Sequence, residues 1–173
     1  MKSLDKIKVL WLLGNTEKKS LKDIEDFNPD HLISFGYRHI ITPDIIHKYK
    51  IINVHIAFLP WNRGADPNFW SAYLNTPCGV TIHIIDEGVD TGDILVQKEM
   101  FFPDEMTLRQ TYDRLVREGW HLLFTNFEAI LKGTLIPWKQ PRYHSVKDGR
   151  ELIKRLPFGW DTSLGYVRKM KEV

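Results

Sequence analysis

Asn53, His55 and Asp90 are the residues of this chain whose chemical types fit acyl transfer. Asn53 and His55 stand two positions apart in the run "YKIINVHIAFLP", and the alternation of a β-strand would point both side chains the same way. Asp90 follows a second β-branched run, "GVTIHIID", in a loop that contains two glycines. An amide can donate a hydrogen bond to a developing oxyanion, an imidazole can shuttle a proton, and a carboxylate can tune that imidazole.

The position of Asn53 inside an apolar strand requires an explanation. A buried amide side chain that finds no hydrogen-bond partner costs about 1 to 3 kcal/mol. Either Asn53 and His55 lie at a frayed strand end and bond to backbone or water, or they line a pocket at the carboxyl ends of parallel strands. The loop that follows, "LPWNRG", favours the pocket, because Pro60 and Gly64 restrict its path and Arg63 adds a planar cation.

The loop after "GVTIHIID" carries four carboxylates, which suggests calcium at first sight. They are Asp86, Glu87, Asp90 and Asp93. Their spacing does not match the EF-hand loop and no bidentate glutamate closes it, so no metal is predicted. His83, on the same strand face as Thr81 and Ile85, is interpreted as a satisfied core or interface histidine. No serine, threonine or cysteine nucleophile stands beside these groups, which favours direct transfer between two bound substrates.

Strands and helices alternate along the chain. Helices are predicted where Thr42 and Asp66 each precede a proline, and a long helix is predicted from Thr107 to Lys132, with Gly133 as its stop. Alternating strands and helices predict an α/β fold, with a mostly parallel sheet flanked by helices. Runs rich in β-branched residues predict strands over residues 7–14, 31–37, 51–58, 79–86 and 93–101.

Length and charge limit the organisation and the partners. The 173 residues are predicted to form a single domain, with a core over about residues 30–140 and an extension over residues 134–173, read as a hairpin or extended stretch and then a short helix or two. Lys and Arg number 24 against 22 Asp and Glu, so no nucleic acid and no membrane partner is predicted. The single cysteine, Cys78, cannot form an internal disulfide, and a cytoplasmic location is expected.

The combined motifs resemble one enzyme family. The segments "NVH", "LP", "RG" and "GVTIHIIDEGVDTGDI" are similar to the core of the formyltransferases that use N10-formyltetrahydrofolate, over roughly residues 30–140. The resemblance implies a Rossmann-like formyltransferase fold and a catalytic triad of Asn53, His55 and Asp90. Only 52 residues precede Asn53, fewer than is usual in the family, so the sheet is expected to be trimmed at the N-terminus.

The resemblance also implies the two substrates. N10-formyltetrahydrofolate would be the co-substrate, without a metal, because "SFGYRHII" at residues 34–41 is similar to the segment that edges the pterin pocket. The stretch "RGADPNFW" resembles sugar N-formyltransferases, which implies a nucleotide-linked amino sugar of the dTDP-4-amino-4,6-dideoxyhexose type, a role in lipopolysaccharide O-antigen biosynthesis, and a homodimer. The implied folate-binding residues are Phe35, Gly36, Tyr37, Ile40, Ile41, Asp86, Glu87 and Gly88, and the implied substrate-binding residues are Trp61, Arg63 and Tyr143.

Other functions stay open on the sequence alone. A methionyl-tRNA formyltransferase would share this core, but with a basic carboxyl-terminal domain that 173 residues do not accommodate. A formyltetrahydrofolate hydrolase would use the same triad with water as acceptor, and a non-catalytic folate-binding protein could keep the pocket. A metal hydrolase built on His55, His83 and Asp90 comes from another class and would be inactivated by a chelator.

Overall fold

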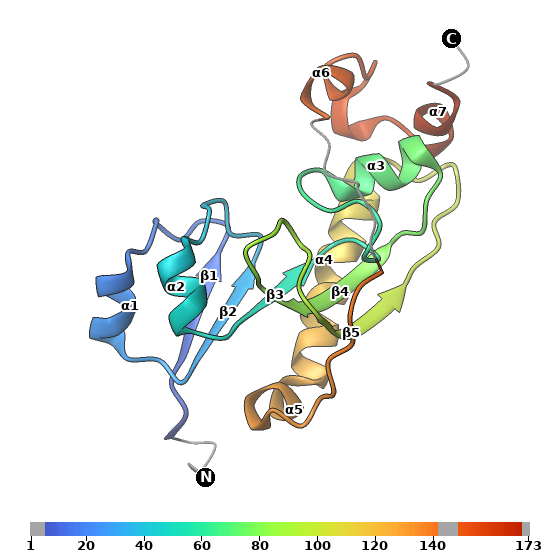
Figure 1. Ribbon diagram of the computed structural model, residues 1–173. Coiled ribbons are helices and arrows are strands. Elements are labelled where there is room, and N and C mark those ends of the chain that lie inside the picture. The colour runs from blue at the N-terminus through green and yellow to red at the C-terminus, as the bar shows by residue number, and fades with distance from the viewer. Residues whose placement is uncertain (1–5, 142–148, 171–173) are drawn as a thin grey trace.

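The computed structural model describes residues 6–141 and 149–170, and its centre is one mixed five-stranded sheet (Figure 1). Strands β1, β2 and β3 pair in parallel, whereas β4 runs antiparallel to both β3 and β5. Four of the five strands therefore point the same way, which confirms the mostly parallel sheet and adds one reversed strand. In spatial order the strands are β1 (Val9–Leu13), β2 (His31–Phe35), β3 (Ile51–His55), β4 (Gly79–Ile84) and β5 (Ile94–Glu99).

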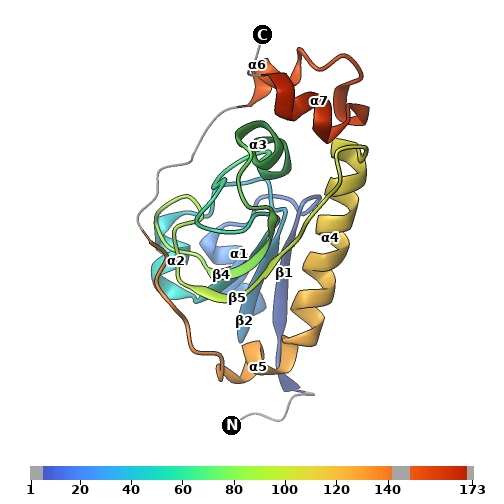
Figure 2. The same cartoon turned by 90° about the vertical axis from the view of Figure 1, so that its right-hand side faces the viewer.

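Helices cover both faces of the sheet (Figure 2). Helix α4 (Leu108–Thr125) packs on one face, where Ile52 and Val54 of β3 join its core. Helices α1 (Leu21–Phe27) and α2 (Pro43–Lys48) pack on the other, where Ile51 belongs to the core. By strand alternation, Asn53 and His55 share the face of Ile51, beyond the end of its apolar core.

The long helix is interrupted once. Helix α4 begins next to Thr107, as predicted, and the Thr107 side chain accepts from the Gln110 backbone amide in a capping box. The expectation of a single helix to Lys132 is wrong, because Asn126 leaves helical geometry and its side chain donates to Leu122 O (2.8 Å). Helix α5 (Phe127–Lys132) follows and ends at Gly133, which adopts a left-handed conformation (φ 65°).

Prolines mark the starts of two of the other helices. Helices α2 and α3 (Pro67–Leu74) begin at the prolines as predicted, but neither Thr42 nor Asp66 makes a side-chain capping bond. Helix α1 was not predicted, because it is seven residues long and buries only Ile24, which leaves almost no periodic apolar signal.

After α5 the chain runs beside β5 and then packs against α3 and α4. Ile94 and Trp138 exchange both backbone hydrogen bonds (2.9 and 3.0 Å), so an extended segment lies beside β5. In the described residues three short helices follow, where one or two were expected, and they pack around α3 and the start of α4 (Figure 2). They are α6 (Arg150–Ile153), the 3-10 helix η2 (Gly159–Asp161) and α7 (Leu164–Lys169). Among the described residues, no helix combines the length and apolarity that crossing a bilayer requires.

Candidate active site

Antiparallel pairing of β3 and β4 builds the first half of the site. Asn53 stands opposite His83 in the register, and its amide nitrogen lies 3.1 Å from His83 Nε2. His83 Nδ1 lies 2.9 Å from Ile84 O. A carbonyl oxygen only accepts, so Nδ1 carries a proton and, in the neutral ring, Nε2 accepts from the Asn53 amide. His83 therefore fixes the direction of that amide.

Asp90 completes the cluster from the loop between β4 and β5. Its Oδ2 lies 3.5 Å from His55 Nε2, and its Oδ1 lies 3.5 Å from His83 Nε2. The Gly64 amide donates to Oδ2 at 2.8 Å. Burial alone would raise the pKa of Asp90, but the neighbouring His55 and the Gly64 amide outweigh it and hold that pKa well below its ordinary value. The carboxylate therefore stays ionised between two imidazoles.

The geometry of the loop explains why Asp90 is the carboxylate that reaches the two histidines. Asp90 adopts a left-handed conformation (φ 51°), and a Cβ on Gly92 would lie 1.7 Å from Ile84 O, so the chain can pass that point only as glycine. Asp86 accepts from the Gly88 amide within the loop (3.2 Å), and Asp93 pairs with Lys139 (3.0 Å). Because these carboxylates diverge, no group of three His, Cys, Asp or Glu in residues 6–141 and 149–170 has the arrangement of a metal site.

Two pockets meet at this cluster. The larger has a volume of about 550 Å³ and opens toward the start of α3, and the smaller, of about 300 Å³, lies between the segment after β2 and the 85–90 loop. Tyr37, Asn53 and Asp90 line both pockets. His55 lines the larger pocket and His83 the smaller. The polar groups thus stand in the wall that two neighbouring ligands would share.

The eight residues expected at the folate divide between these pockets. Phe35 and Gly36 line the larger one, although Phe35 is 8% exposed and its ring packs on Trp120, with centroids 4.9 Å apart. The others gather in the smaller pocket, where Ile40 is 87% exposed at the rim. These residues are Tyr37, Ile40, Ile41, Asp86, Glu87 and Gly88.

Of the residues expected at the acceptor, Arg63 and Trp61 line neither pocket. Arg63 is 7% exposed, and its Nη2 and Nε donate to Gln140 Oε1 (2.7 and 3.2 Å) instead of facing the larger pocket. Trp61 is absent from the lining of both pockets, and Tyr143 lies outside the described residues. Arg38, Asp66 and Tyr112 line the larger pocket and were not predicted as site residues.

Residues 13–126 match the formyl transferase family. The chain belongs to this family. It is 38% identical to the formyltransferase PseJ from Anoxybacillus kamchatkensis, whose crystal structure contains UDP-4,6-dideoxy-4-formamido-L-AltNAc and tetrahydrofolate. That match has a TM-score of 0.84 and covers 92% of this chain and 97% of PseJ. The sheet is thus the Rossmann-like sheet of the formyltransferases, as the motifs implied.

Curated relatives of this formyl transferase extend beyond it. The methionyl-tRNA formyltransferase of Clostridium botulinum is 33% identical over 127 residues, which is 72% of this chain but 41% of that enzyme. The chain therefore spans about two fifths of such relatives. A likely sugar N-formyltransferase from Mycobacterium tuberculosis, Rv3404c, shares the fold at a TM-score of 0.75 with 22% identity.

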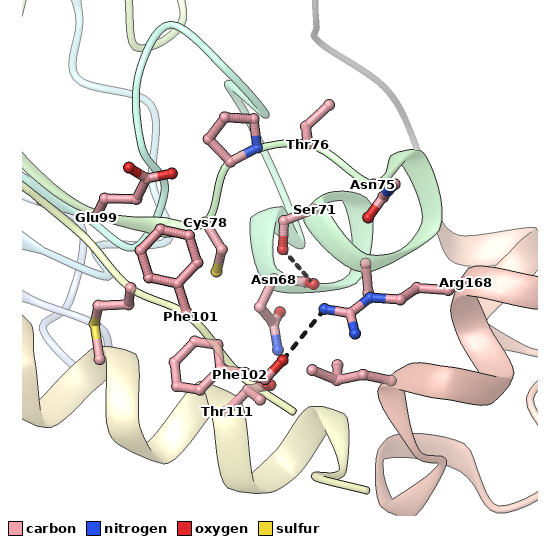
Figure 3. Close-up of a pocket in the computed structure, with 14 residues that line it drawn as sticks. Asn68, Ser71, Asn75, Thr76, Cys78, Glu99, Phe101, Phe102, Thr111 and Arg168 are labelled. Carbon is pink, nitrogen blue, oxygen red and sulfur yellow. Dashed lines mark hydrogen bonds between the residues drawn. The ribbon is translucent and has the colours of Figure 1, made fainter. Parts of the chain in front are cut away.

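Another pocket of this formyl transferase lies where α3 meets α7 (Figure 3). Its volume is about 270 Å³, and Arg168 extends into it from α7 and donates to Phe102 O at 3.4 Å. Burial raises the pKa of the Cys78 thiol in its wall. Asn68 Oδ1 and Arg168 Nε are buried there without a hydrogen-bond partner among the described residues. Among the described residues, no imidazole lines this pocket, and its charged residues are Glu99 and Arg168.

Proposed function

We propose that this formyl transferase moves a formyl group from N10-formyltetrahydrofolate to the amine of a nucleotide-linked amino sugar. The observation that carries the proposal is the position of Asn53 and Asp90, which line both pockets and so would touch both substrates at once. Direct transfer needs the two reacting centres within near-attack distance, about 3 to 3.5 Å. The likeness to PseJ, crystallised with tetrahydrofolate and a UDP-linked formamido sugar, supports the same pair of substrates.

The smaller pocket suits the folate. Ile41, Ile46 and Ile85 give it apolar walls, while the 86–90 loop offers main-chain donors and acceptors at its edge. A reduced pterin is a flat heterocycle with several hydrogen-bonding groups, so apolar faces and a polar edge match its needs. We assign this pocket to the donor.

The larger pocket suits the acceptor. Its walls include Arg38, Asp66 and Tyr112, which can bind a phosphate, sugar hydroxyls and a ring respectively. The PseJ complex favours a UDP-linked 4-amino sugar as the first acceptor to test, with the dTDP-linked sugar implied by the motifs as the second. The role in lipopolysaccharide O-antigen biosynthesis, the homodimer and the cytoplasmic location stay predictions of the sequence.

Asn53 would stabilise the tetrahedral intermediate. The uncharged amine attacks the formyl carbon, a C–N bond forms, and the carbonyl π electrons move to oxygen. One N–H of the Asn53 amide is held by His83 Nε2 at 3.1 Å, and the other is available to donate to that oxygen. Such a donor costs no reorganisation at the moment of reaction, and removing one typically costs about 100- to 1,000-fold in turnover.

His55 and Asp90 would manage the charge and the proton. His55 Nε2 lies 3.3 Å from Asn62 O and 3.5 Å from Asp90 Oδ2, so its proton points at two acceptors. The ionised Asp90 would hold His55 beside the oxyanion and accept, through a water, the proton released by the attacking amine. When the carbonyl reforms, the bond to N10 breaks and N10 takes up that proton.

An acceptor panel tests the proposal. The purified protein is incubated with N10-formyltetrahydrofolate and one of four acceptors: a UDP-linked 4-amino sugar, its dTDP counterpart, methionyl-tRNA, or water alone. Tetrahydrofolate release is followed by absorbance, and the formamido product by mass spectrometry. We expect saturable formylation of an amino sugar. Formylation of methionyl-tRNA alone, which the curated relatives make the second candidate, or release of formate in water, would contradict it.

A further inference from the structure

Gln140 joins the Asp90 loop to Arg63 through every hydrogen bond that its side chain can make. Its Nε2 donates to Asp90 O (3.0 Å) and Gly92 O (2.6 Å). Its Oε1 accepts from Nη2 (2.7 Å) and Nε (3.2 Å) of Arg63. An amide side chain has two N–H donors and two acceptor lone pairs, so all four are used. Such complete use is typical of a side chain that fixes neighbouring backbone.

We propose that Gln140 is a positioning residue for Asp90, holding the 86–93 loop so that the Asp90 carboxylate stays between His55 and His83. This inference rests on the role proposed above for Asp90. It also assigns Arg63 to the support of that loop rather than to the wall of the acceptor pocket.

The loop needs such support because its own contacts at Asp90 are few and long. The carboxylate has one short hydrogen bond, from Gly64, while both histidine contacts are 3.5 Å, longer than a hydrogen bond. The left-handed backbone of Asp90 (φ 51°) is itself a conformation that the surrounding structure must maintain. A small movement of the main chain would therefore change both histidine contacts.

Gln140 is anchored independently of the loop that it holds. Trp138, two residues before it, pairs with Ile94 of β5 through both backbone bonds, and Arg63 also donates to Pro141 O at 3.4 Å. Arg63 is buried, and burial lowers the pKa of its guanidinium while the nearby Asp90 and Asp86 act against that change. Gln140 and Arg63 thus connect the segment beside β5 with the loop after β3. The two residues are 77 positions apart in the sequence.

Two substitutions at Gln140 separate its donors from its acceptor. Gln140→Leu removes both. Gln140→Glu keeps an oxygen for Arg63 but turns the two donors into a carboxylate that faces two carbonyl oxygens. We expect kcat to fall by about 10- to 100-fold in both variants, with little change in either KM, because misplacement of about 1 Å can cost that much. Wild-type kcat in Gln140→Glu would overturn the assigned role of the donors.

Gln97 provides a matched control. It is also a partly buried glutamine that donates two hydrogen bonds, to Leu59 O (2.6 Å) and to Thr81 Oγ1 (2.9 Å), and both acceptors lie outside the 86–93 loop. We expect Gln97→Leu to lose stability comparably and to keep the wild-type kcat. An equal loss of kcat in Gln97→Leu would assign the effect to general destabilisation and contradict the proposal.

A titration reports on the support without any turnover. The Asp90 carboxyl carbon is followed by ¹³C NMR against pH in the ligand-free wild type, Gln140→Leu, Gln140→Glu and Gln97→Leu. The groups that face Asp90 are His55, His83 and the charge of Arg63. If the loop is released, the pKa of Asp90 should rise toward its ordinary value in both Gln140 variants. In Gln97→Leu the pKa of Asp90 should stay as low as in the wild type.

The outcomes separate this inference from the proposed function. A wild type that formylates no acceptor contradicts the proposed function, while the titration still tests whether Gln140 holds Asp90. An active wild type whose kcat and Asp90 titration are unchanged in both folded Gln140 variants contradicts the positioning role alone.

Discussion

Two regions of this formyl transferase bury polar side chains, and they differ in what those side chains meet. At the end of β3, Asn53 faces His83, and Asp90 lies 3.5 Å from both histidines. In the pocket between α3 and α7, Asn68 uses its Nδ2 on Leu108 O (3.0 Å), while its Oδ1 has no partner among the described residues (Figure 3). The first region brings together an amide, two imidazoles and a carboxylate. In the second region the Asn68 amide lies at the start of α4.

The comparison teaches that burial of polar groups does not by itself mark a reaction centre. What distinguishes the β3 region is that an amide, two imidazoles and a carboxylate converge where two pockets meet. The lowered pKa of Asp90 follows from that convergence, whereas the raised pKa of Cys78 follows from burial. If the distinction is right, substitutions in the two regions should affect different quantities.

The largest effect is expected for Asp90→Asn. The side chain keeps its shape but loses the charge that supports His55 and the capacity to accept the amine proton, so we expect turnover to fall by about 10³-fold. Asp93→Asn, on the same loop but paired with Lys139, is the matched control and should stay near wild type. Steady-state kinetics with both substrates checks this, and a folded Asp90→Asn variant with wild-type kcat would contradict it.

The next effect is expected for Asn53→Ala. Loss of the oxyanion donor should lower kcat by about 100- to 1,000-fold while the protein stays folded. Asn126→Ala is the control, because that amide donates to Leu122 O at the end of α4, away from the site. Kinetics together with circular dichroism would show the difference; equal losses at both positions would remove the special role of Asn53.

A smaller effect is expected for Gly92→Ala. The new methyl group would meet Ile84 O, so the loop must shift and carry Asp90 with it. We expect kcat to fall by about 10- to 100-fold and the free energy of unfolding to fall by about 1 to 3 kcal/mol. Urea unfolding and kinetics on the same preparation measure both, and a variant that loses stability but no activity would show that the loop position is not critical.

The pH dependence of the unfolding free energy should show the contribution of the Asp90 region. The pKa of Asp90 is lower in the folded state than in the unfolded chain, so its stabilising effect is present above the unfolded value of about 3.9 and is lost as pH falls further. Unfolding free energies measured at pH 5 and pH 3 should therefore drop more steeply in the wild type than in Asp90→Asn. Parallel slopes would mean that the folded protein does not stabilise the ionised form of Asp90.

The smallest effect on catalysis is expected for Asn68→Ala, in the other pocket. Loss of its bond to Leu108 O should lower the free energy of unfolding by about 1 to 2 kcal/mol and leave kcat within about twofold of wild type. Thermal or urea unfolding checks the first value and kinetics the second. A large loss of kcat in this variant would break the distinction between the two regions.

Local patterns in the sequence predicted much of this arrangement. The alternation of β3 put Asn53 and His55 on one face, and a proline marked the start of both α2 and α3. His83 was read as a core histidine because its partner depends on the register between β3 and β4, which no local pattern contains. The break at Asn126 depended on one side chain competing for the backbone of the preceding turn.

The acceptor side was the least predictable part of the site. Arg63 followed a pocket-lining strand and carried a charge suited to a phosphate, yet it donates to Gln140, 77 residues later in the chain. The sequence around either residue does not predict the contact, because the contact depends on the path of the segment that contains Gln140 along β5. Arg38 and Tyr112, which line the larger pocket, come from different parts of the fold and share no motif.

The central claim is that two substrates meet at Asn53 and Asp90, and co-crystallisation tests it most directly. Crystals would be grown with a folate analogue and a UDP- or dTDP-linked 4-amino sugar. The account predicts the folate in the smaller pocket, the sugar in the larger, and the amine within hydrogen-bond reach of the Asp90 carboxylate or one water away. Folate and sugar bound so that Asn53 and Asp90 do not lie between them would contradict it.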